Sequence, residues 1–537
     1  MRIKYFLLIF SLLSLTPLGV AKAASLPTGD LIIEGGGPSS QQALQRIKAI
    51  MGAKRLCVIT TANPDPSQLA EGFAKLGLNA QPIKITAANA SAPARVAELS
   101  ACEGFYFDGG LPRLLTDAFI VKGRDSLALA TIRARFQEGA MVAGSSAGAM
   151  ILGDQSLCTC SPETSFKVLH GTPPEIVQGF GFVHLIIDAH AFMRNLYGRE
   201  LMAMQLQGWP KLLAIDESTA VEVPGDGSNW RVLGDSAVAL IKHPPKSAKP
   251  LRDYEVSLLR RDDGIDPASI EAATTNRKAD RHDHQGISEI LHLPAQGLLQ
   301  MAALISAEQA ESYGWDWFWD PAAPVRLRLA LTDESQAFEN QTEKGAANDL
   351  LTHLRFSVQI LTRAELGLAI EGRDDRIASD WAVPPSDGPR TSCIYLAMTP
   401  MAGPGVTTAD RHAVLSAIQS GARLINALPS QPDGKAMAIP GSVRLGSAGA
   451  CDATQGEIRR EIRGEVMDRL AVHLREITHA NFDQPLIFYC ANELCWHSYN
   501  AAQRARLLGY RRVYWYRGGL RDWLAQGGAV ENIADSW

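Results

Sequence analysis

A serine in a tight, glycine-rich turn is the residue in this sequence whose setting best suits a nucleophile. Residues 144–148 read Gly-Ser-Ser-Ala-Gly, a G-x-S-x-G pattern, and directly follow the apolar run 139–143. A buried strand that ends in this pattern and runs into small helix formers is typical of a nucleophile elbow, which lifts a serine hydroxyl above a sheet. Small residues are needed beside it because the backbones come close there. We therefore predict Ser146 as a nucleophile, the alternative being a small-residue turn without chemistry.

Three further apolar segments end in residues that could serve this nucleophile. They lead into Gly109-Gly110, into His190 and into Glu217. From residue 31 onward such strands alternate with segments whose apolar residues recur at helical spacing. This alternation predicts an α/β domain with a parallel sheet covered by helices on both faces, and sites in such sheets lie at the carboxyl ends of the strands. We therefore expect these residues to gather around Ser146.

A run of three glycines, Gly35-Gly36-Gly37, follows the first expected strand. It lacks the G-x-G-x-x-G spacing of a dinucleotide-binding loop, so we predict no nucleotide there and no cofactor elsewhere. Residues 282–284 read His-Asp-His and have metal-ligand types, but no further cysteine or histidine lies nearby. We interpret them as a surface loop and predict no metal site.

The motifs resemble, in kind and order, peptidase family S51, the cyanophycinase and aspartyl-dipeptidase group. The resemblance covers roughly residues 30–262 and rests on Phe107-x-Gly-Gly110, Gly144-x-Ser-Ala-Gly-Ala149, Asp188-x-His190 and Ile215-Asp-Glu217. It implies a fold similar to class I glutamine amidotransferases. It also implies a Ser-His-Glu triad.

That triad falls on Ser146, His190 and Glu217, with Glu163 as the fallback acid. The residue types suit the chemistry, because a serine hydroxyl needs a base within hydrogen-bond reach and the base needs an acid that fixes its tautomer. The backbone N–H of Ala147, together with one from Gly109 or Gly110, could hold the developing oxyanion. The alternatives are a core histidine at 190 and a surface charge at 217.

Substrate choice follows less directly from the sequence. Family members that digest cyanophycin bind the β-aspartyl-arginine unit through an acidic residue, glutamines and arginines near the histidine. Asp188, Arg194 and Arg199 fall on matching positions, but Ala189 and Leu196 replace a glutamine and an arginine, and the glutamine expected after Gly110 is absent. We expect a small peptide substrate whose carboxylate is bound by an arginine. The alternative is that the arginines are solvated helix residues.

The final third of the chain contains the segments Gly421-Ala-Arg-Leu-Ile-Asn426, Ala438-Ile-Pro-Gly-Ser-Val443, Pro485-Leu-Ile-Phe-Tyr-Cys490 and 508–523. On these segments, residues 401–537 resemble a rhodanese-like domain and are similar to periplasmic forms associated with quinone-dependent catabolism that carry a Cys-Trp motif. In rhodaneses a cysteine that ends a central strand carries a persulfide, cradled by N–H groups of a loop leading into a helix. Cys490 has that position, and Cys495 lies in the loop before the expected helix. The resemblance implies a sulfur donor or acceptor as partner.

Two departures leave the chemistry of these cysteines open. The loop from Cys490 to Ser498 is longer than the usual cradle, and Asn426 stands where an aspartate is common. Cys490 and Cys495 could instead form a redox-active or structural disulfide, or remain inert thiols. The pairing of the eight cysteines in the chain cannot be read from the sequence.

The first residues of the sequence and its net charge indicate where the protein is located and which partners it binds. Residues 1–23 combine a basic start, an apolar run and a small-x-small ending, which predicts a cleaved signal peptide and a periplasmic or secreted protein with no membrane span after cleavage. The formal net charge of −5, without a basic run, argues against nucleic acid as a partner.

The predicted organisation has four parts. They are the signal peptide at 1–23, the S51-like serine hydrolase domain at 24–262, a small β-containing connecting region of unknown role at 263–400, and the rhodanese-like domain at 401–537. We predict an exported serine peptidase for short aspartyl or isoaspartyl peptides. The alternatives are a noncatalytic scaffold and a periplasmic sulfurtransferase or redox protein that uses Cys490 and Cys495. An α/β-hydrolase esterase is disfavoured, because that fold places its histidine last in the chain.

Overall fold

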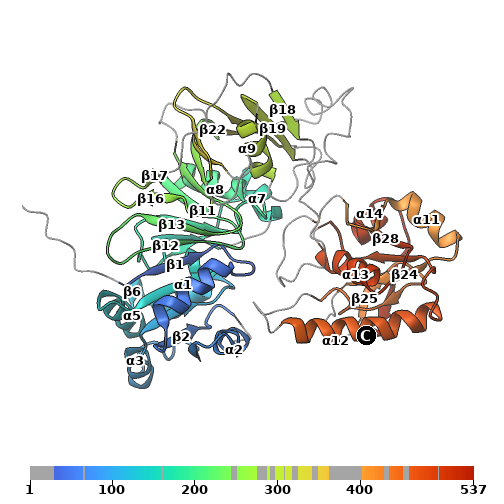
Figure 1. The fold of residues 1–537 in the computed structure, drawn as a ribbon, viewed down its shortest axis with the longest axis horizontal. Helices are drawn as coiled ribbons and strands as arrows, with labels where there is room; N and C mark the ends of the chain where they lie inside the picture. The colour runs from blue at the N-terminus through green and yellow to red at the C-terminus, as the bar shows by residue number, and fades with distance from the viewer. Residues whose placement is uncertain are drawn as a thin grey trace, which may run out of the picture.

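The computed structural model describes most of the chain (Figure 1). The described residues are 29–63, 67–158, 162–243, 251–274, 287–290, 297–307, 309–316, 325–340, 349–361, 399, 402–428, 435–450, 459–493 and 495–537. The expected signal peptide, the His-Asp-His loop at 282–284, Cys160, Cys393 and Cys451 lie outside them.

The first sheet contains the predicted parallel strands. Its order is β17-β16-β13-β12-β1-β7-β4-β2-β3, and β1, β7, β4, β2 and β3 run parallel, whereas β12, β13, β16 and β17 are joined to them by antiparallel pairings. The strands are β1 (Leu31–Glu34), β2 (Arg55–Ile59), β3 (Asn79–Ile83), β4 (Gly104–Phe107), β7 (Met141–Ser145), β12 (Thr219–Val223), β13 (Trp230–Gly234), β16 (Gly264–Asp266) and β17 (Glu271–Ala273).

Helices cover both faces of this sheet, as the apolar periodicity predicts. α1 (Gln41–Met51) and α2 (Ser67–Lys75) pack on one face, while α3 (Pro93–Ser100), α4 (Pro112–Phe119) and α5 (Leu127–Gln137) pack on the other. In β4, successive side chains alternate between the two cores, with Tyr106 on the α1 side and Phe105 and Phe107 on the α5 side. The sheet is therefore buried on both faces, as is usual for parallel strands.

A second sheet lies beside the first and carries much of the region that the sequence left without a role. Its order is β10-β11-β14-β15-β22-β20-β19-β18, with β21 paired to β22. The strands are β10 (Ile186–Ala189), β11 (Lys211–Ile215), β14 (Val238–Lys242), β15 (Tyr254–Leu259), β18 (Ile287–Ile290), β19 (Glu311–Asp316), β20 (Val325–Ala330), β21 (Gln336–Phe338) and β22 (Leu350–Ile360), and α9 (Gly297–Ala307) packs against them.

The boundary expected at residues 262/263 falls inside these sheets. β16 and β17 extend the first sheet beyond β13, and β22 pairs with β15 so that Phe356 lies opposite Tyr254. The described part of 263–360 thus continues the sheets of the N-terminal half instead of forming a separate connecting domain. Without β22, one edge of β15 would be open. The N–H and C=O groups of that edge are hydrogen-bonded by β22, which follows about a hundred positions later in the chain.

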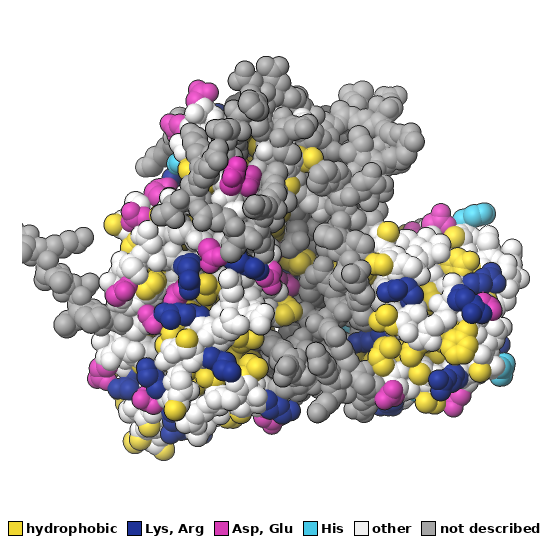
Figure 2. All heavy atoms as spheres, in the orientation of Figure 1, with side chains coloured by type: hydrophobic (Ala, Val, Ile, Leu, Met, Phe, Trp, Pro, Cys, Tyr) yellow, Lys and Arg dark blue, Asp and Glu magenta, His cyan; other side chains and the backbone are white. Residues whose placement is uncertain are grey.

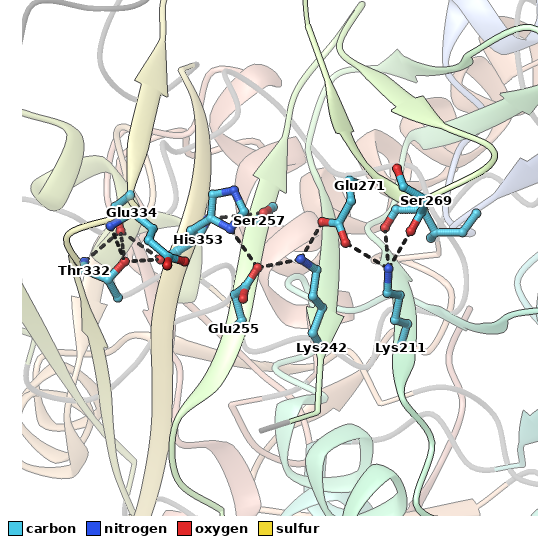
Figure 3. Close-up of polar contacts among 11 residues, drawn as sticks. Lys211, Lys242, Glu255, Ser257, Ser269, Glu271, Thr332, Glu334 and His353 are labelled. Carbon is cyan, nitrogen blue, oxygen red and sulfur yellow. Dashed lines mark hydrogen bonds and ion pairs between the residues drawn. The ribbon is translucent and has the colours of Figure 1, made fainter. Parts of the chain in front are cut away.

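A row of charged side chains joins the two sheets (Figure 3). Glu271 of β17 pairs with Lys211 at 2.9 Å and with Lys242 at 2.5 Å, and Lys242 also pairs with Glu255 at 2.6 Å. His353 Nδ1 lies 2.8 Å from Glu255 Oε1. Because Glu271 comes from the first sheet and the others from the second, the row links residues on both sides of the expected boundary.

The C-terminal part contains a separate parallel sheet with helices on both faces. Its order is β23-β28-β27-β24-β26, and every pairing is parallel. The elements are β23 (Thr407–Ala409), β24 (Arg423–Asn426), β26 (Val443–Arg444), β27 (Leu486–Tyr489) and β28 (Val513–Tyr516), with α12 (Arg459–Thr478) and α13 (Trp496–Leu507) on one face and α11 (Arg411–Gln419) and α14 (Gly519–Ala525) on the other. The α/β class predicted for both ends of the chain is confirmed.

The described surface mixes both signs of charge. On the face drawn in Figure 2, lysine and arginine side chains are interspersed with aspartate and glutamate over both halves of the molecule. Within the described ranges, no helix is long and apolar enough to cross a bilayer.

Candidate active site

Ser146 lies in a strained turn between β7 and α6 (Ala147–Met150). Its φ of +54° is in the left-handed region, and its N–H donates to the Glu34 carbonyl at 3.0 Å. The flanking glycines are required by space, since a Cβ on Gly144 would lie 2.2 Å from the Gly148 carbonyl oxygen, and a Cβ on Gly148 would lie 2.0 Å from the Phe107 carbonyl oxygen. Strain of this kind persists only where the surroundings enforce it, and it leaves the half-buried hydroxyl above the sheet edge.

The serine, histidine and glutamate predicted from the strand ends are in hydrogen-bond contact. Ser146 Oγ lies 2.7 Å from His190 Nε2, and His190 Nδ1 lies 2.7 Å from Glu217 Oε1. His190 follows β10 and Glu217 follows β11, neighbouring parallel strands of the second sheet, whereas Ser146 comes from the first. The site therefore lies where the two sheets meet. Glu163, the fallback acid, is in α7 (Pro162–Leu169), and its side chain is outside the described part.

The glycine run after β1 shapes the site, a role that the sequence analysis missed. A Cβ on Gly36 would lie 2.2 Å from His190 Cε1, and a Cβ on Gly37 would lie 2.8 Å from Glu217 Oε2. The carbonyl of Gly35 accepts the His190 N–H at 2.9 Å. The signal was present in the sequence, because three glycines directly after a central strand indicate close approach of something to the backbone.

Asp216 is a second missed residue, and it fixes the turn that carries the histidine. Its Oδ1 accepts the N–H groups of Phe192 at 3.1 Å and Met193 at 2.7 Å, and its Oδ2 accepts the Ser236 hydroxyl at 2.6 Å. Asp216 is fully buried. His190 has a φ of +60°, so the turn needs such support to hold the ring toward Ser146.

The residues predicted to bind substrate lie in the interior. Asp188 and Arg199 form an ion pair with each other, with 0% and 1% of their surfaces exposed, so the prediction that they contact substrate does not fit this structure. Arg194 is also buried, and its Nε donates to Glu217 Oε1 at 3.2 Å. Buried charges in proteins are paired in this way because desolvation of a lone ion is costly. Arg194 therefore contacts Glu217, and the Asp188–Arg199 pair lies beside it in the interior, with Asp188 on the strand that leads to His190.

The predicted oxyanion donors differ in their surroundings. Gly109 lies against Ser146, with a hypothetical Cβ only 3.2 Å from Ser146 Cβ, but its N–H donates to Asp108 Oδ1 at 2.7 Å. Gly110 has a φ of +146°, and a Cβ there would lie 2.0 Å from the Ala62 carbonyl oxygen. Ala147 begins α6 directly after Ser146. Gly110 and Ala147 therefore remain the predicted oxyanion donors. Gly109 instead leaves room beside Ser146 that a larger residue would fill.

Comparison with known proteins finds two families in this chain. Residues 31–230 match the sequence model of peptidase family S51, and residues 429–526 match that of the rhodanese-like domain. The chain joins an S51 peptidase domain to a rhodanese-like domain. The fold class, including its similarity to class I glutamine amidotransferases, is confirmed together with these assignments.

Solved structures similar to parts of the chain are distant in sequence. A peptidase from an acI-B1 Actinobacterium is 23% identical with a TM-score of 0.33, and covers 41% of this chain and 93% of its own. A putative peptidase E protein from Listeria monocytogenes is 17% identical with a TM-score of 0.29, covering 39% and 100%. A thiosulfate sulfurtransferase from Pseudomonas aeruginosa is 17% identical with a TM-score of 0.17, covering 24% and 20%.

The electrostatics of the S51 site favour a neutral histidine beside an ionised glutamate. Burial and the nearby Arg194 guanidinium lower the pKa of His190 to about 4, against the opposing effect of Glu217. Burial by itself would raise the pKa of Glu217, but the contacts with His190 and Arg194 outweigh it, and the net pKa is lowered. Above about pH 4 the imidazole is therefore free to accept a proton from Ser146.

In the rhodanese-like domain the two predicted cysteines are bonded to each other. Cys490 ends β27 with 1% of its surface exposed and forms a disulfide with Cys495, which is the N-cap residue of α13. The disulfide alternative is thus the one present, and Cys490 is not a free thiol. Asn426, the other departure, is buried and donates through Nδ2 to the Met437 carbonyl at 2.9 Å. No group of metal-binding side chains occurs among the residues described.

Proposed function

We propose that the S51 domain is a serine peptidase in which Ser146 is the nucleophile, His190 the general base and Glu217 the acid that orients the base. The observation that carries the proposal is the pair of 2.7 Å contacts that link the three side chains in this order. Such a chain is what activates a serine hydroxyl, which is a weak nucleophile by itself.

The proposed reaction follows from the direction of these contacts. His190 Nε2 takes the Ser146 proton as the oxygen attacks the peptide carbonyl, and the imidazolium is stabilised by Glu217 at Nδ1. The N–H groups of Gly110 and Ala147 hold the negative oxygen of the tetrahedral intermediate. His190 then returns the proton to the leaving amine, and a water molecule, activated by the same base, releases the acyl group.

For substrates, we propose short peptides with an aspartyl or isoaspartyl residue. The support is the family match over residues 31–230 together with the motif order described above. A panel of α-aspartyl, β-aspartyl and non-acidic dipeptides, each assayed for kcat/KM, tests the class. Equal turnover of the non-acidic dipeptides would contradict it and leave the serine mechanism standing.

Replacement of the nucleophile tests the mechanism directly. Ser146→Ala is expected to lower kcat for the best dipeptide by at least about 10³-fold, because no neighbouring group can replace the hydroxyl. Ser145→Ala is the matched control, since it removes the preceding hydroxyl in the same turn and is expected to stay within about tenfold of the parent. Equal loss in the two variants would refute the assignment.

A covalent probe separates an active peptidase from a noncatalytic scaffold. A fluorophosphonate reacts only with an activated serine, so we expect one labelled peptide, modified at Ser146, in the parent protein and none in His190→Gln. A scaffold that has lost activity would leave Ser146 unlabelled.

We also propose export, on the basis of the pattern of residues 1–23 and of the disulfides Cys57–Cys102 and Cys490–Cys495, which persist in oxidising compartments. N-terminal sequencing of the protein from a fractionated bacterial host should find a chain that begins after Ala23 in the periplasmic fraction. An uncleaved chain confined to the cytosol would overturn this.

A further inference from the structure

The described residues contain two disulfides with different surroundings. Cys57 in β2 and Cys102 after α3 are both fully buried in the core of the first sheet, and 45 residues separate them. Cys490 and Cys495 are separated by only five residues and lie at the carboxyl end of the sheet of the rhodanese-like domain. A crosslink that closes so short a loop constrains the unfolded chain less than one that closes a long loop, so the second disulfide is expected to be the weaker stabiliser.

The two sulfurs of the Cys490–Cys495 disulfide are not equivalent. Cys490 is 1% exposed, whereas Cys495 is half-buried and reaches the surface. Cys495 is also the N-cap residue of α13, a helix of 12 residues whose positive end stabilises a thiolate. Access and thiolate stability therefore both single out Cys495, not the strand-end cysteine.

The loop between the cysteines is held in place by contacts that do not involve sulfur. The Cys490 carbonyl accepts the Leu520 N–H at 2.9 Å, and the Glu493 carbonyl accepts the Thr399 N–H at 2.8 Å and the Thr399 hydroxyl at 2.7 Å. Arg517 Nη2 in turn donates to the Thr399 carbonyl at 3.0 Å. Because none of these contacts depends on the S–S bond, we expect them to keep the two sulfurs close enough to re-form it.

The charges around the loop include two arginines, Arg517 and Arg521, and one carboxylate, Asp522. The guanidinium groups of Arg517 and Arg521 act on the Glu493 carboxyl in the middle of the loop, while burial raises the pKa of that carboxyl. Cationic side chains near a cysteine favour its thiolate form, which is the form that exchanges.

We propose that Cys490 and Cys495 form an exchangeable redox disulfide in which Cys495 is the sulfur that reacts with an external thiol and Cys490 is the internal resolving cysteine. This activity is independent of the peptidase proposal, and it reverses the roles expected from the rhodanese resemblance. Breaking the bond also releases Cys490 as the thiol that a persulfide would require.

The exchange balances with external thiol as the only co-reactant. A thiolate attacks Cys495 Sγ, the bond from Cys495 to the external sulfur forms, and the Cys490–Cys495 bond breaks with its electron pair on Cys490, which takes a proton from water. A second thiolate then attacks the external sulfur of the mixed disulfide, and Cys495 leaves. The net result is that two external thiols are oxidised to one disulfide while the protein disulfide is reduced to two thiols.

Redox titration of the full-length protein tests whether the disulfide exchanges. The oxidised protein is equilibrated in glutathione and glutathione disulfide mixtures of increasing reducing strength, quenched with acid, alkylated with N-ethylmaleimide and digested for mass spectrometry. Alkylation at Cys490 and Cys495 is expected in mixtures in which Cys57 and Cys102 remain bonded. If the two disulfides are reduced only together, when the protein unfolds, the proposal is wrong.

Reactivity of the two sulfurs tests their roles. In the reduced parent protein, limiting iodoacetamide should label Cys495 at least about tenfold faster than Cys490. With glutathione disulfide, Cys490→Ser should accumulate a mixed disulfide on Cys495, whereas Cys495→Ser should react at least about tenfold more slowly. Faster labelling of Cys490 in the parent would refute the assignment, and this result does not depend on whether a variant folds. Transfer of one sulfur atom from thiosulfate to Cys490 without prior reduction would also refute it, because Cys490 would then be the reactive sulfur, as in rhodaneses.

Discussion

The S51 domain and the rhodanese-like domain each place a nucleophile type just after a buried parallel strand, and they present it differently. Ser146 is itself the residue in the turn, half-buried and in contact with its base. Cys490 has the corresponding strand-end position but is 1% exposed and bonded to a sulfur at the start of the next helix. A strand-end position thus determines where chemistry can occur, whereas burial and bonding determine which atom can perform it.

The largest expected effect follows from replacement of Glu217, the proposed acid. Glu217→Gln keeps the shape of the side chain but removes its charge, so His190 loses the partner that fixes its tautomer. We expect kcat/KM for the best dipeptide to fall by about 10³–10⁴-fold.

Glu222→Gln is the matched control for this change. Glu222 is also a buried glutamate with arginine partners, Arg46 and Arg231, but it lies on β12 and contacts no triad residue in the described structure. Its variant should lose stability while keeping kcat/KM within about tenfold. Similar kinetic losses in both variants would show that Glu217 acts only through folding.

The disulfides extend the comparison to stability. From loop length, Cys57–Cys102 is expected to stabilise the protein by about 4 kcal/mol and Cys490–Cys495 by about 2 kcal/mol. Urea unfolding of the double variants Cys57→Ala/Cys102→Ala and Cys490→Ala/Cys495→Ala, followed separately for each domain, measures this difference. A larger loss from the second pair would make that disulfide structural and weaken the case for exchange.

The glycine run offers a smaller but sharper test of the S51 site. Gly36→Ala places a methyl group 2.2 Å from the His190 ring at a backbone φ of +92°, so we expect kcat/KM to fall by roughly 100-fold through displacement of the base. Gly52→Ala is the control, because its φ of +50° is also unfavourable while nothing lies within 4 Å. If Gly52→Ala lowers kcat/KM as much, backbone strain and not the histidine contact explains the loss.

The sequence predicted the site better than the architecture around it. Ser146, His190 and Glu217 each follow an apolar strand, as predicted. The alignment of parallel strands explains why His190 and Glu217 are neighbours, but Ser146 follows a strand of the other sheet and joins them where the two sheets meet. The second sheet was not predictable, since alternation identifies β22 as a strand without naming β15 as its partner about a hundred residues earlier. The place of the described strands of 263–360 in the two sheets therefore could not be read from the sequence.

Residue type also could not distinguish a surface arginine from an interior one. Arg194 and Arg199 follow the histidine on a turn and helix whose pattern is equally compatible with a solvated face, yet both are buried against carboxylates. Their partners, Glu217 and Asp188, belong to strands, and the pairing depends on how the strands and the helix pack. The same limit applies to Cys490, whose burial and bond to Cys495 cannot be read from residue type.

The pH dependence of the peptidase gives the smallest expected effect and isolates one of these buried arginines. Because Arg194 lowers the pKa of His190, replacing it with methionine should raise that pKa above about 4 and move the acid limb of kcat/KM to higher pH. The base is then protonated, and inactive, at a pH where the parent still works. Arg113→Met, which removes an exposed arginine paired with Glu175, should leave the limb in place. An unchanged limb in Arg194→Met would show that burial, and not the arginine charge, sets the pKa of the histidine.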